Sequence, residues 1–107
     1  EPHESRAMDR IVSIVLTEKR PLDKDKVNTW IKDLFIASGF KILRGKGFLN
    51  FAGSDHRFVF QSVRRTFHSQ ADRPWKPDEA RESVIVLIGE DLGDAAELQQ
   101  SFSACVA

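Results

Sequence analysis

The sequence has a single cysteine, and this scarcity excludes two kinds of site. Cys105 has no second cysteine with which to form an internal disulfide, and one thiolate cannot build a zinc site of the cysteine type. The spacing of apolar residues puts Cys105 on the core side of a C-terminal helix, so we expect a buried structural thiol. The scarcity of cysteine fits a reducing compartment, and we expect a cytoplasmic protein.

Long apolar runs and net charge are also missing. The longest apolar run, residues 84–88, is far shorter than the roughly 20 residues that cross a bilayer, and residues 1–10 contain no apolar signal-peptide core. We therefore expect no membrane partner. The 16 basic residues balance the 16 acidic residues, so the whole chain has no net field that would attract nucleic acid.

The composition that remains is that of one globular domain. The chain has 107 residues, of which 41% are hydrophobic and 30% charged, enough for a single core. Because a strand pattern begins almost at once and no initiator methionine precedes it, we predict that residues 1–9 are the remnant of an interdomain linker. Residues 10–107 then form the domain.

The apolar periodicity predicts an α+β fold. Strands are expected over residues 10–18, 42–51, 57–63 and 83–88, with residues 64–71 as a further candidate strand and residues 71–80 as an irregular loop. A helix should follow Asp23 as N-cap, and a last helix should begin at Asp91 or Asp94. We predict two layers: a mixed sheet of four or five strands with helices on one face, in the order β-α-β-β-(β)-β-α.

No catalytic constellation can be assembled from these residues. A phosphate loop would need four residues between its glycines, but five separate Gly39 from Gly45, and the segment lies within a strand. The three histidines, His3, His56 and His68, lack the spacing of a zinc site, and no nucleophile has a base beside it. Two glycines, Gly45 and Gly47, share one face of a strand, where a bulge, a close backbone approach or a bound ligand is expected.

Local charge is the one strong asymmetry. Residues 41–76 hold eight basic and two acidic residues, a net charge of +6 in 36 residues, with phenylalanines between them. A sheet with this pattern could bind RNA or single-stranded DNA by stacking bases and neutralising phosphates. The alternative, purely structural interpretation is that the phenylalanines are core residues beneath the helices. We expect an acidic protein partner rather than nucleic acid.

Several segments together resemble the C-terminal domain of the CobW family of GTP-hydrolysing metallochaperones. The resemblance covers nearly the whole chain in order, from His3 to Cys105, and is carried by residues 43–49, 59–63, Trp75, Arg81, 86–89 and 105–107. No single motif decides it. Many members have a histidine after the Phe-Gln-x-Val strand, whereas this chain has Arg64 and Arg65, which weakens any role of this strand end in metal binding.

The resemblance implies a domain that binds without catalysing. In the family, an N-terminal GTPase domain with a phosphate loop and a cysteine-containing metal motif precedes such a domain, and the whole protein is linked to zinc homeostasis, cobalamin biosynthesis and metal insertion. GTP, Mg²⁺ and zinc or cobalt would therefore belong to the full-length protein, and this part would hold no cofactor and perform no reaction. The implied partners are the GTPase domain of the same chain and a metalloenzyme client.

The contact surface expected for those partners combines the basic strand with its neighbours. It comprises Arg44, Lys46, Gly47, Gln61, Arg64 and Trp75. His3 corresponds to a junction histidine of the family and is a weak candidate metal ligand, since one imidazole makes a poor site. The metal, the client and the oligomeric state are not encoded in any pattern that we can identify.

Overall fold

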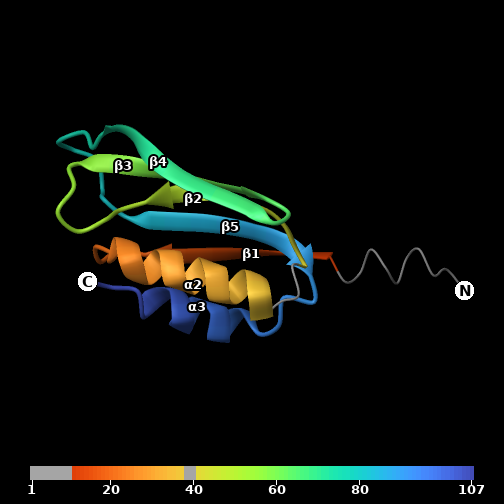
Figure 1. Cartoon of the computed structure of the whole chain (residues 1–107). Helices are drawn as coiled ribbons and strands as arrows, with labels where there is room; N and C mark the ends of the chain where they lie inside the picture. The colour runs from red at the N-terminus through yellow and green to blue at the C-terminus, as the bar shows by residue number, and fades with distance from the viewer. Residues whose placement is uncertain (1–10, 38–40) are drawn as a thin grey trace, which may run out of the picture.

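The computed structural model describes residues 11–37 and 41–107, and the elements follow the predicted order (Figure 1). The linker of residues 1–9 and His3 lie outside the described residues. The strands are β1 (Ile11–Glu18), β2 (Ile42–Leu49), β3 (His56–Val63), β4 (Thr66–Pro74) and β5 (Ser83–Glu90), and the helices are α2 (Lys24–Ala37) and α3 (Ala95–Ser103). The candidate strand after residue 63 therefore exists as β4.

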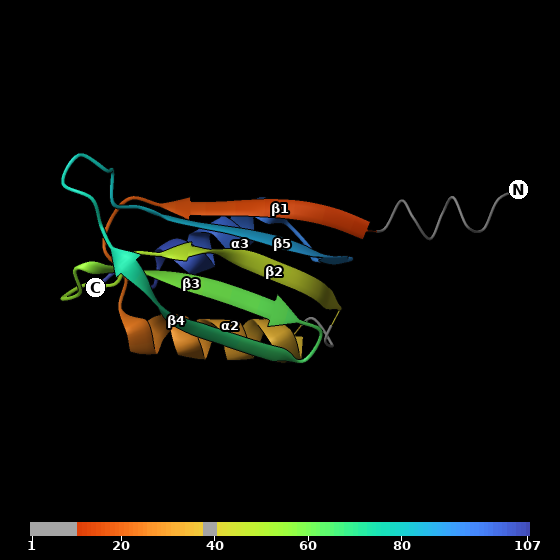
Figure 2. The same ribbon diagram turned by 90° about the horizontal axis from the view of Figure 1, so that it is seen from above.

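The five strands form one sheet in the order β1-β5-β2-β3-β4, with both helices on one face (Figures 1 and 2). All four strand pairings are antiparallel, so the predicted α+β, two-layer architecture is confirmed but the sheet is not mixed. The reason is that β5 inserts between β1 and β2. These two strands, joined through α2, point the same way without pairing with each other.

Two boundaries differ from the sequence prediction for identifiable physical reasons, and one predicted alternative is decided. Residues 71–74 belong to β4 rather than to a loop, because β4 is an edge strand and Pro74, at its end, needs no outward donor. Gly89 does not end β5 but lies within it, where a Cβ would meet the Lys41 carbonyl oxygen at 2.5 Å. Of the two predicted caps of the last helix, Asp94 is the one used, and it accepts a hydrogen bond from the Ala96 N–H at 2.9 Å.

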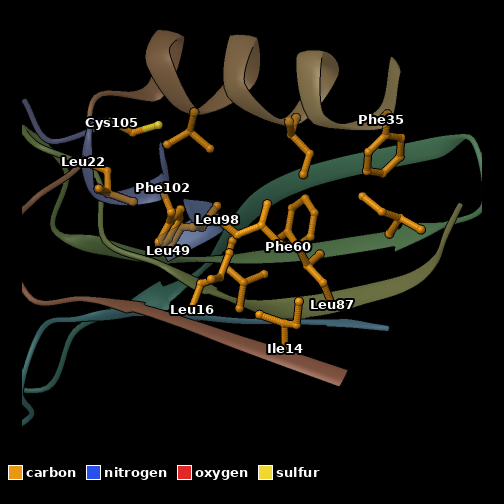
Figure 3. Close-up of a cluster of buried hydrophobic side chains, with 14 of the residues drawn as sticks. Ile14, Leu16, Leu22, Phe35, Leu49, Phe60, Leu87, Leu98, Phe102 and Cys105 are labelled. Atoms are coloured by element: carbon orange, nitrogen blue, oxygen red, sulfur yellow. The ribbon is translucent and has the colours of Figure 1, made fainter. Parts of the chain in front are cut away.

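The core lies between the sheet and the helices (Figure 3). α2 contributes Val27, Ile31 and Phe35, and α3 contributes Leu98 and Phe102. Leu16 and Leu87, on β1 and β5, are completely buried beneath them. Burying each such side chain stabilises the fold by roughly 1.5–3 kcal/mol, which explains why one helical layer suffices to hold the sheet. Among the described residues, no helix covers the other face of the sheet.

Candidate functional site

The helix-free face of the sheet is the candidate site. Side chains alternate between the two faces of each strand, so the residues that do not point at the helices gather on this face. In the central strands they are Arg44, Lys46 and Phe48 of β2, Val59, Gln61 and Val63 of β3, and Val84, Val86 and Ile88 of β5. We call this set the open face.

Two adjoining depressions hollow the open face. One, of about 360 Å³, is lined by Arg44, Val63 and Ile88 among others. The second, of about 380 Å³, is lined by Phe48, Val59 and Val84 among others. Lys46, Gln61 and Val86 line both, so the two form one trough across β2, β3 and β5. Its floor is apolar, because valine and isoleucine side chains line it: Val59, Val63, Val84, Val86 and Ile88.

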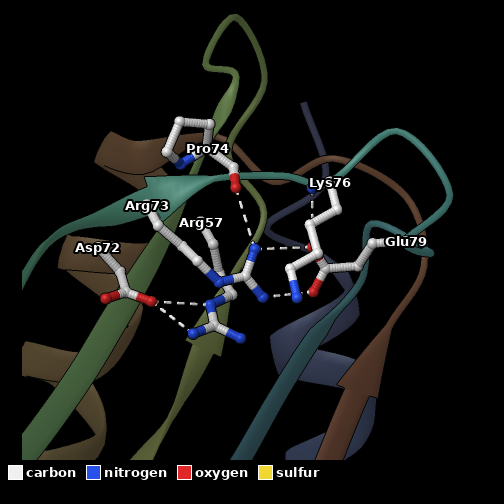
Figure 4. A network of polar contacts seen from close by, with 6 residues as sticks. All are labelled: Arg57, Asp72, Arg73, Pro74, Lys76 and Glu79. Atoms are coloured by element: carbon white, nitrogen blue, oxygen red, sulfur yellow. Dashed lines mark hydrogen bonds and ion pairs between the residues drawn. The ribbon is translucent and has the colours of Figure 1, made fainter.

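Positive charge lies along this trough. Arg44 and Lys46 are both exposed, and no ion pair joins either to another residue of the described chain. Arg57 differs: its guanidinium lies 3.8 Å from the centre of the Phe48 ring, and its Nε donates to Asp72 at 3.0 Å (Figure 4). Within the open face as defined above, the charge available to a partner is therefore that of Arg44 and Lys46.

The structure brings together some of the predicted contact residues and separates others. Arg44, Lys46 and Gln61 line the same depression. Arg64 lies at the nearby β3–β4 turn with a φ of 53°, and its backbone N–H donates to the Leu43 carbonyl at 3.1 Å. Gly47 lines the second depression, but its lack of a side chain serves close packing between β2 and β5.

Trp75 is the predicted contact residue that lies elsewhere. Its side chain is only 8% exposed, and its backbone N–H donates to the Asp55 carbonyl at 2.9 Å, at the end of β3 opposite Arg64. An aromatic residue between two prolines looks exposed in the sequence. The fold instead buries the ring, so Trp75 offers almost no surface to a partner.

The phenylalanines of the basic segment also face away from the site. Phe51 and Phe60 are 3% and 2% exposed, and Phe58 and Phe67 pack against the same core. The rings of Phe51 and Phe58 meet edge to face at 4.9 Å, and Phe67 meets Phe35 of α2 at 5.3 Å. Only Phe48 remains on the open face, beneath Arg57. The aromatic platform that a base-stacking sheet requires is therefore occupied by the core.

The side chains of the site are suited to binding rather than to bond chemistry. Within residues 11–37 and 41–107, no three His, Cys, Asp or Glu side chains are grouped so as to hold a metal ion. The cations of the open face would themselves repel one. Cys105 is buried, which raises the pKa of its thiol, and its Sγ contacts the Lys26 and Ser101 carbonyl oxygens. Neither helix of the described part is long and apolar enough to cross a membrane.

Sequence reasoning missed the apolar half of the site. The uninterrupted apolar run at residues 83–88 is typical of a central strand that is buried on both faces. β5 is indeed flanked by strands on both sides, yet the side chains of Val84, Val86 and Ile88 lie on the open face and are only partly buried. The available signal was the number of predicted helices, because the two helices of the described residues are enough to cover one face of a five-stranded sheet but not both faces.

Comparison with known proteins assigns this chain to a family. The family model of the cobalamin synthesis protein CobW C-terminal domain matches residues 11–106, which is nearly all of the chain. The chain belongs to this family. As a CobW C-terminal domain it is 37% identical over 93 residues to the zinc chaperone YjiA of Escherichia coli, and 42% identical over 59 residues to the zinc chaperone CobW of Pseudomonas aeruginosa. These matches cover 87% and 55% of the chain.

Solved structures agree with the sequence comparison. The CobW C-terminal domain described here superposes on the crystal structure of Zn(II)-bound YjiA GTPase from E. coli with a TM-score of 0.84 at 32% identity, over 100% of this chain. A Zn(II)-bound triple mutant of the same GTPase gives a TM-score of 0.83 at 35% identity over 92% of the chain. The chain spans only 29% of YjiA and 16% of the Pseudomonas protein, and 33% and 30% of the two solved chains. The domain is thus one part of much longer relatives.

Proposed function

We propose that this CobW C-terminal domain is the recognition module of a GTP-dependent metallochaperone. In this role it performs no reaction itself, recognises a metalloenzyme client and closes against the GTPase domain of its own chain during delivery of zinc or cobalt in the cytoplasm. GTP, Mg²⁺ and the metal would be held by that other domain. The names of the relatives, zinc chaperone and Zn(II)-bound GTPase, support this assignment.

The single observation that carries the proposal is the open face. It combines an apolar trough with two exposed cations that have no ion-pair partner within the described chain. Phe48 and Val63 are 39% and 57% exposed there. Exposed apolar area that is rimmed by charge is typical of a protein interface. A partner with carboxylates above Arg44 and Lys46 would match this surface.

A protein partner fits this surface better than a nucleic acid. Stacking of bases needs several exposed rings, and four of the five phenylalanines of the basic segment face the helices. Phosphate binding needs many free cations, but Arg57 is paired with Asp72 and Arg73 with Glu79. The proposed site is therefore a patch for an acidic and apolar protein surface.

Calorimetric titration can test the proposal with the GTPase region of E. coli YjiA, loaded with GTP analogue and Zn²⁺, as the probe. We expect the wild-type domain to bind and the double variant Arg44→Glu, Lys46→Glu to bind at least tenfold more weakly. The matched control reverses two exposed lysines outside the open face, Lys19→Glu with Lys32→Glu, and should bind like the wild type. Equal binding by the Arg44 and Lys46 variant would remove the open face from the proposal.

A further inference from the structure

The outer edge of β1 has backbone groups that point away from the sheet. In an antiparallel pair, alternate residues direct both their N–H and their C=O toward the neighbouring strand, and the others direct them away. Thr17 belongs to the second set, because its N–H donates to Gln99 Oε1 at 3.1 Å and its C=O accepts from Gln99 Nε2 at 2.8 Å. By the same alternation, Ile11, Ser13 and Val15 also direct their backbone groups outward.

Gln99 replaces a strand partner at one position only. Its amide makes with Thr17 the two hydrogen bonds that a neighbouring strand would make, and Nε2 also donates to Ser103 Oγ at 2.9 Å, which fixes the side chain on α3. Elsewhere in the described chain, no residue bonds to the outward groups of Ser13 and Val15. The free edge therefore runs from Ile11 to Val15 and ends at the capped Thr17.

This edge lacks the features that normally prevent strands from pairing with other chains. Exposed edges are usually protected by charges, proline or bulges. Residues 11–17 contain no charge, no proline and no glycine, and Ile11, Val12 and Val15 are 47%, 37% and 58% exposed. The opposite edge, β4, carries Asp72, Arg73 and Pro74 and a bulge at its pairing with β3. Only β4 is protected.

We propose that the β1 edge pairs with β1 of a second copy of this chain. The three free outward positions are symmetric about Ser13, so an antiparallel pair centred there sets Ser13 opposite the partner's Ser13 and Ile11 opposite the partner's Val15. Within residues 11–15, every side-chain pair in this register is uncharged and most are apolar, which is the self-complementarity that a two-fold interface requires. At each end of the paired segment the pairing stops at Thr17 of one copy, because the backbone N–H and C=O of Thr17 are already bonded to Gln99.

Such pairing would join two sheets into one and set two open faces side by side. It uses backbone groups of β1 and none of the side chains of the open face trough, so it stands or falls independently of the proposed recognition of a protein partner. A charged peptide strand would gain no ion pair here. A second copy, by contrast, meets apolar residues with apolar residues at each position of the edge.

The two edges of the sheet supply a matched pair of variants. Ser13→Pro removes an outward N–H of β1 without removing a bond to β5. Val63, which ends β3, pairs with Thr66, which begins β4, across a two-residue turn. The alternation along β4 therefore directs the N–H of Ser69 outward as well. Ser69→Pro is therefore the same change on the other edge. Light scattering after size-exclusion chromatography, from micromolar to near-millimolar chain, should show dimers of the wild type and of Ser69→Pro, and at least tenfold weaker association of Ser13→Pro.

A monomeric wild type at the highest concentration would overturn the proposal, as would undiminished association of Ser13→Pro. Because a proline can also prevent folding, disulfide formation provides a second measurement. Ser13→Cys should form a covalent dimer under mild oxidation, since bonded antiparallel positions hold their Cα atoms at a distance that a disulfide spans. Cys105 is 3% exposed and should not compete. Crosslinking of Ser69→Cys as fast as that of Ser13→Cys would contradict the assigned edge.

Discussion

Gly47 of β2 packs so closely against Val84 of β5 that a side chain at position 47 has no space. A Cβ built there would collide with the Val84 carbonyl oxygen and lie 2.8 Å from the Ile85 Cα. Gly45, two residues earlier on the same face, is less restricted, because its Cβ would meet side-chain atoms, with Ser62 Oγ nearest at 2.7 Å. The two glycines therefore have different tasks: one sets the separation of two strands and the other makes room for side chains.

This difference predicts unequal costs for the two alanine substitutions. Gly47→Ala must displace backbone and should destabilise the domain by about 1–3 kcal/mol, the range for overpacked cores. Gly45→Ala displaces a serine hydroxyl and the ends of Leu87 and Phe60, which can rotate, so we expect about 1 kcal/mol or less. Urea unfolding followed by circular dichroism measures both. Equal midpoints for the two variants would refute the distinction.

Glu18 should make stability depend on pH in the acid range. Its carboxylate accepts from the Arg20 side chain and backbone, with Nε and N each 2.9 Å from Oε2, and these hydrogen bonds lower the pKa of Glu18 from 4.5 to about 2. Above pH 4.5 the carboxylate is charged in both folded and unfolded chains, and the stabilisation is complete. As the pH falls from 4.5 to 2 the unfolded chain binds the proton first, so stability is lost.

Replacing Glu18 isolates this contribution. Glu18→Gln should reduce the free energy of unfolding at neutral pH by about 1 kcal/mol, because Arg20 is largely exposed and its pairing is weakened by water. The variant should also lose less stability than the wild type between pH 4.5 and 2. Asp33→Asn, an exposed change on α2, serves as the control. Parallel stability curves for wild type and Glu18→Gln would argue against the assignment.

A two-point ion pair should fix the loop that buries Trp75. Arg73 donates from both terminal nitrogens to the two oxygens of Glu79, at 2.8 and 2.7 Å, and Glu79 also accepts from the Lys76 N–H at 2.9 Å (Figure 4). These hydrogen bonds, the one from Arg73 first, lower the pKa of Glu79 to about 2. These hydrogen bonds tie the two ends of the loop at residues 74–79 to each other.

Breaking the Arg73–Glu79 ion pair should expose the indole ring of Trp75. In a Trp30→Phe background, which leaves Trp75 as the only tryptophan, Glu79→Gln should shift the emission to the red and raise acrylamide quenching. Glu82→Gln, a substitution farther along the same connection, should leave both unchanged. If Glu79→Gln kept the spectrum of its parent, the burial of Trp75 would depend on contacts other than the ion pair.

The sequence predicted the order of elements because each has a local signature. The apolar stripe on α2, the aspartate cap of α3 and the glycine turn before β3 are fixed by residues near one another in the chain. The antiparallel direction of every pairing could not be predicted that way. It depends on β5 inserting between β1 and β2, a contact between segments more than thirty residues apart.

The candidate site was predicted in part for the same reason. Arg44, Lys46 and Gln61 were predicted from the family resemblance and the local excess of basic residues, and the fold places them together on the open face. The valines of β5 were not, because an uninterrupted apolar run looks alike whether one face or both are covered. Trp75 was misplaced because its burial is a tertiary feature: its backbone N–H is bonded to the Asp55 carbonyl oxygen, on a segment twenty residues earlier in the chain.

The location of Cys105 leads to a last prediction, on reactivity. The thiol follows α3 directly, is 3% exposed and lies against two carbonyl oxygens, and burial raises its pKa. Both burial and a raised pKa reduce the population of reactive thiolate. A chromogenic thiol reagent should therefore label the native domain at least a hundredfold more slowly than the urea-unfolded chain. A Gln70→Cys variant offers an exposed thiol in the same fold, so rapid labelling of one thiol is expected there. Equally rapid labelling of the wild type would mean that α3 and its C-terminal turn open readily.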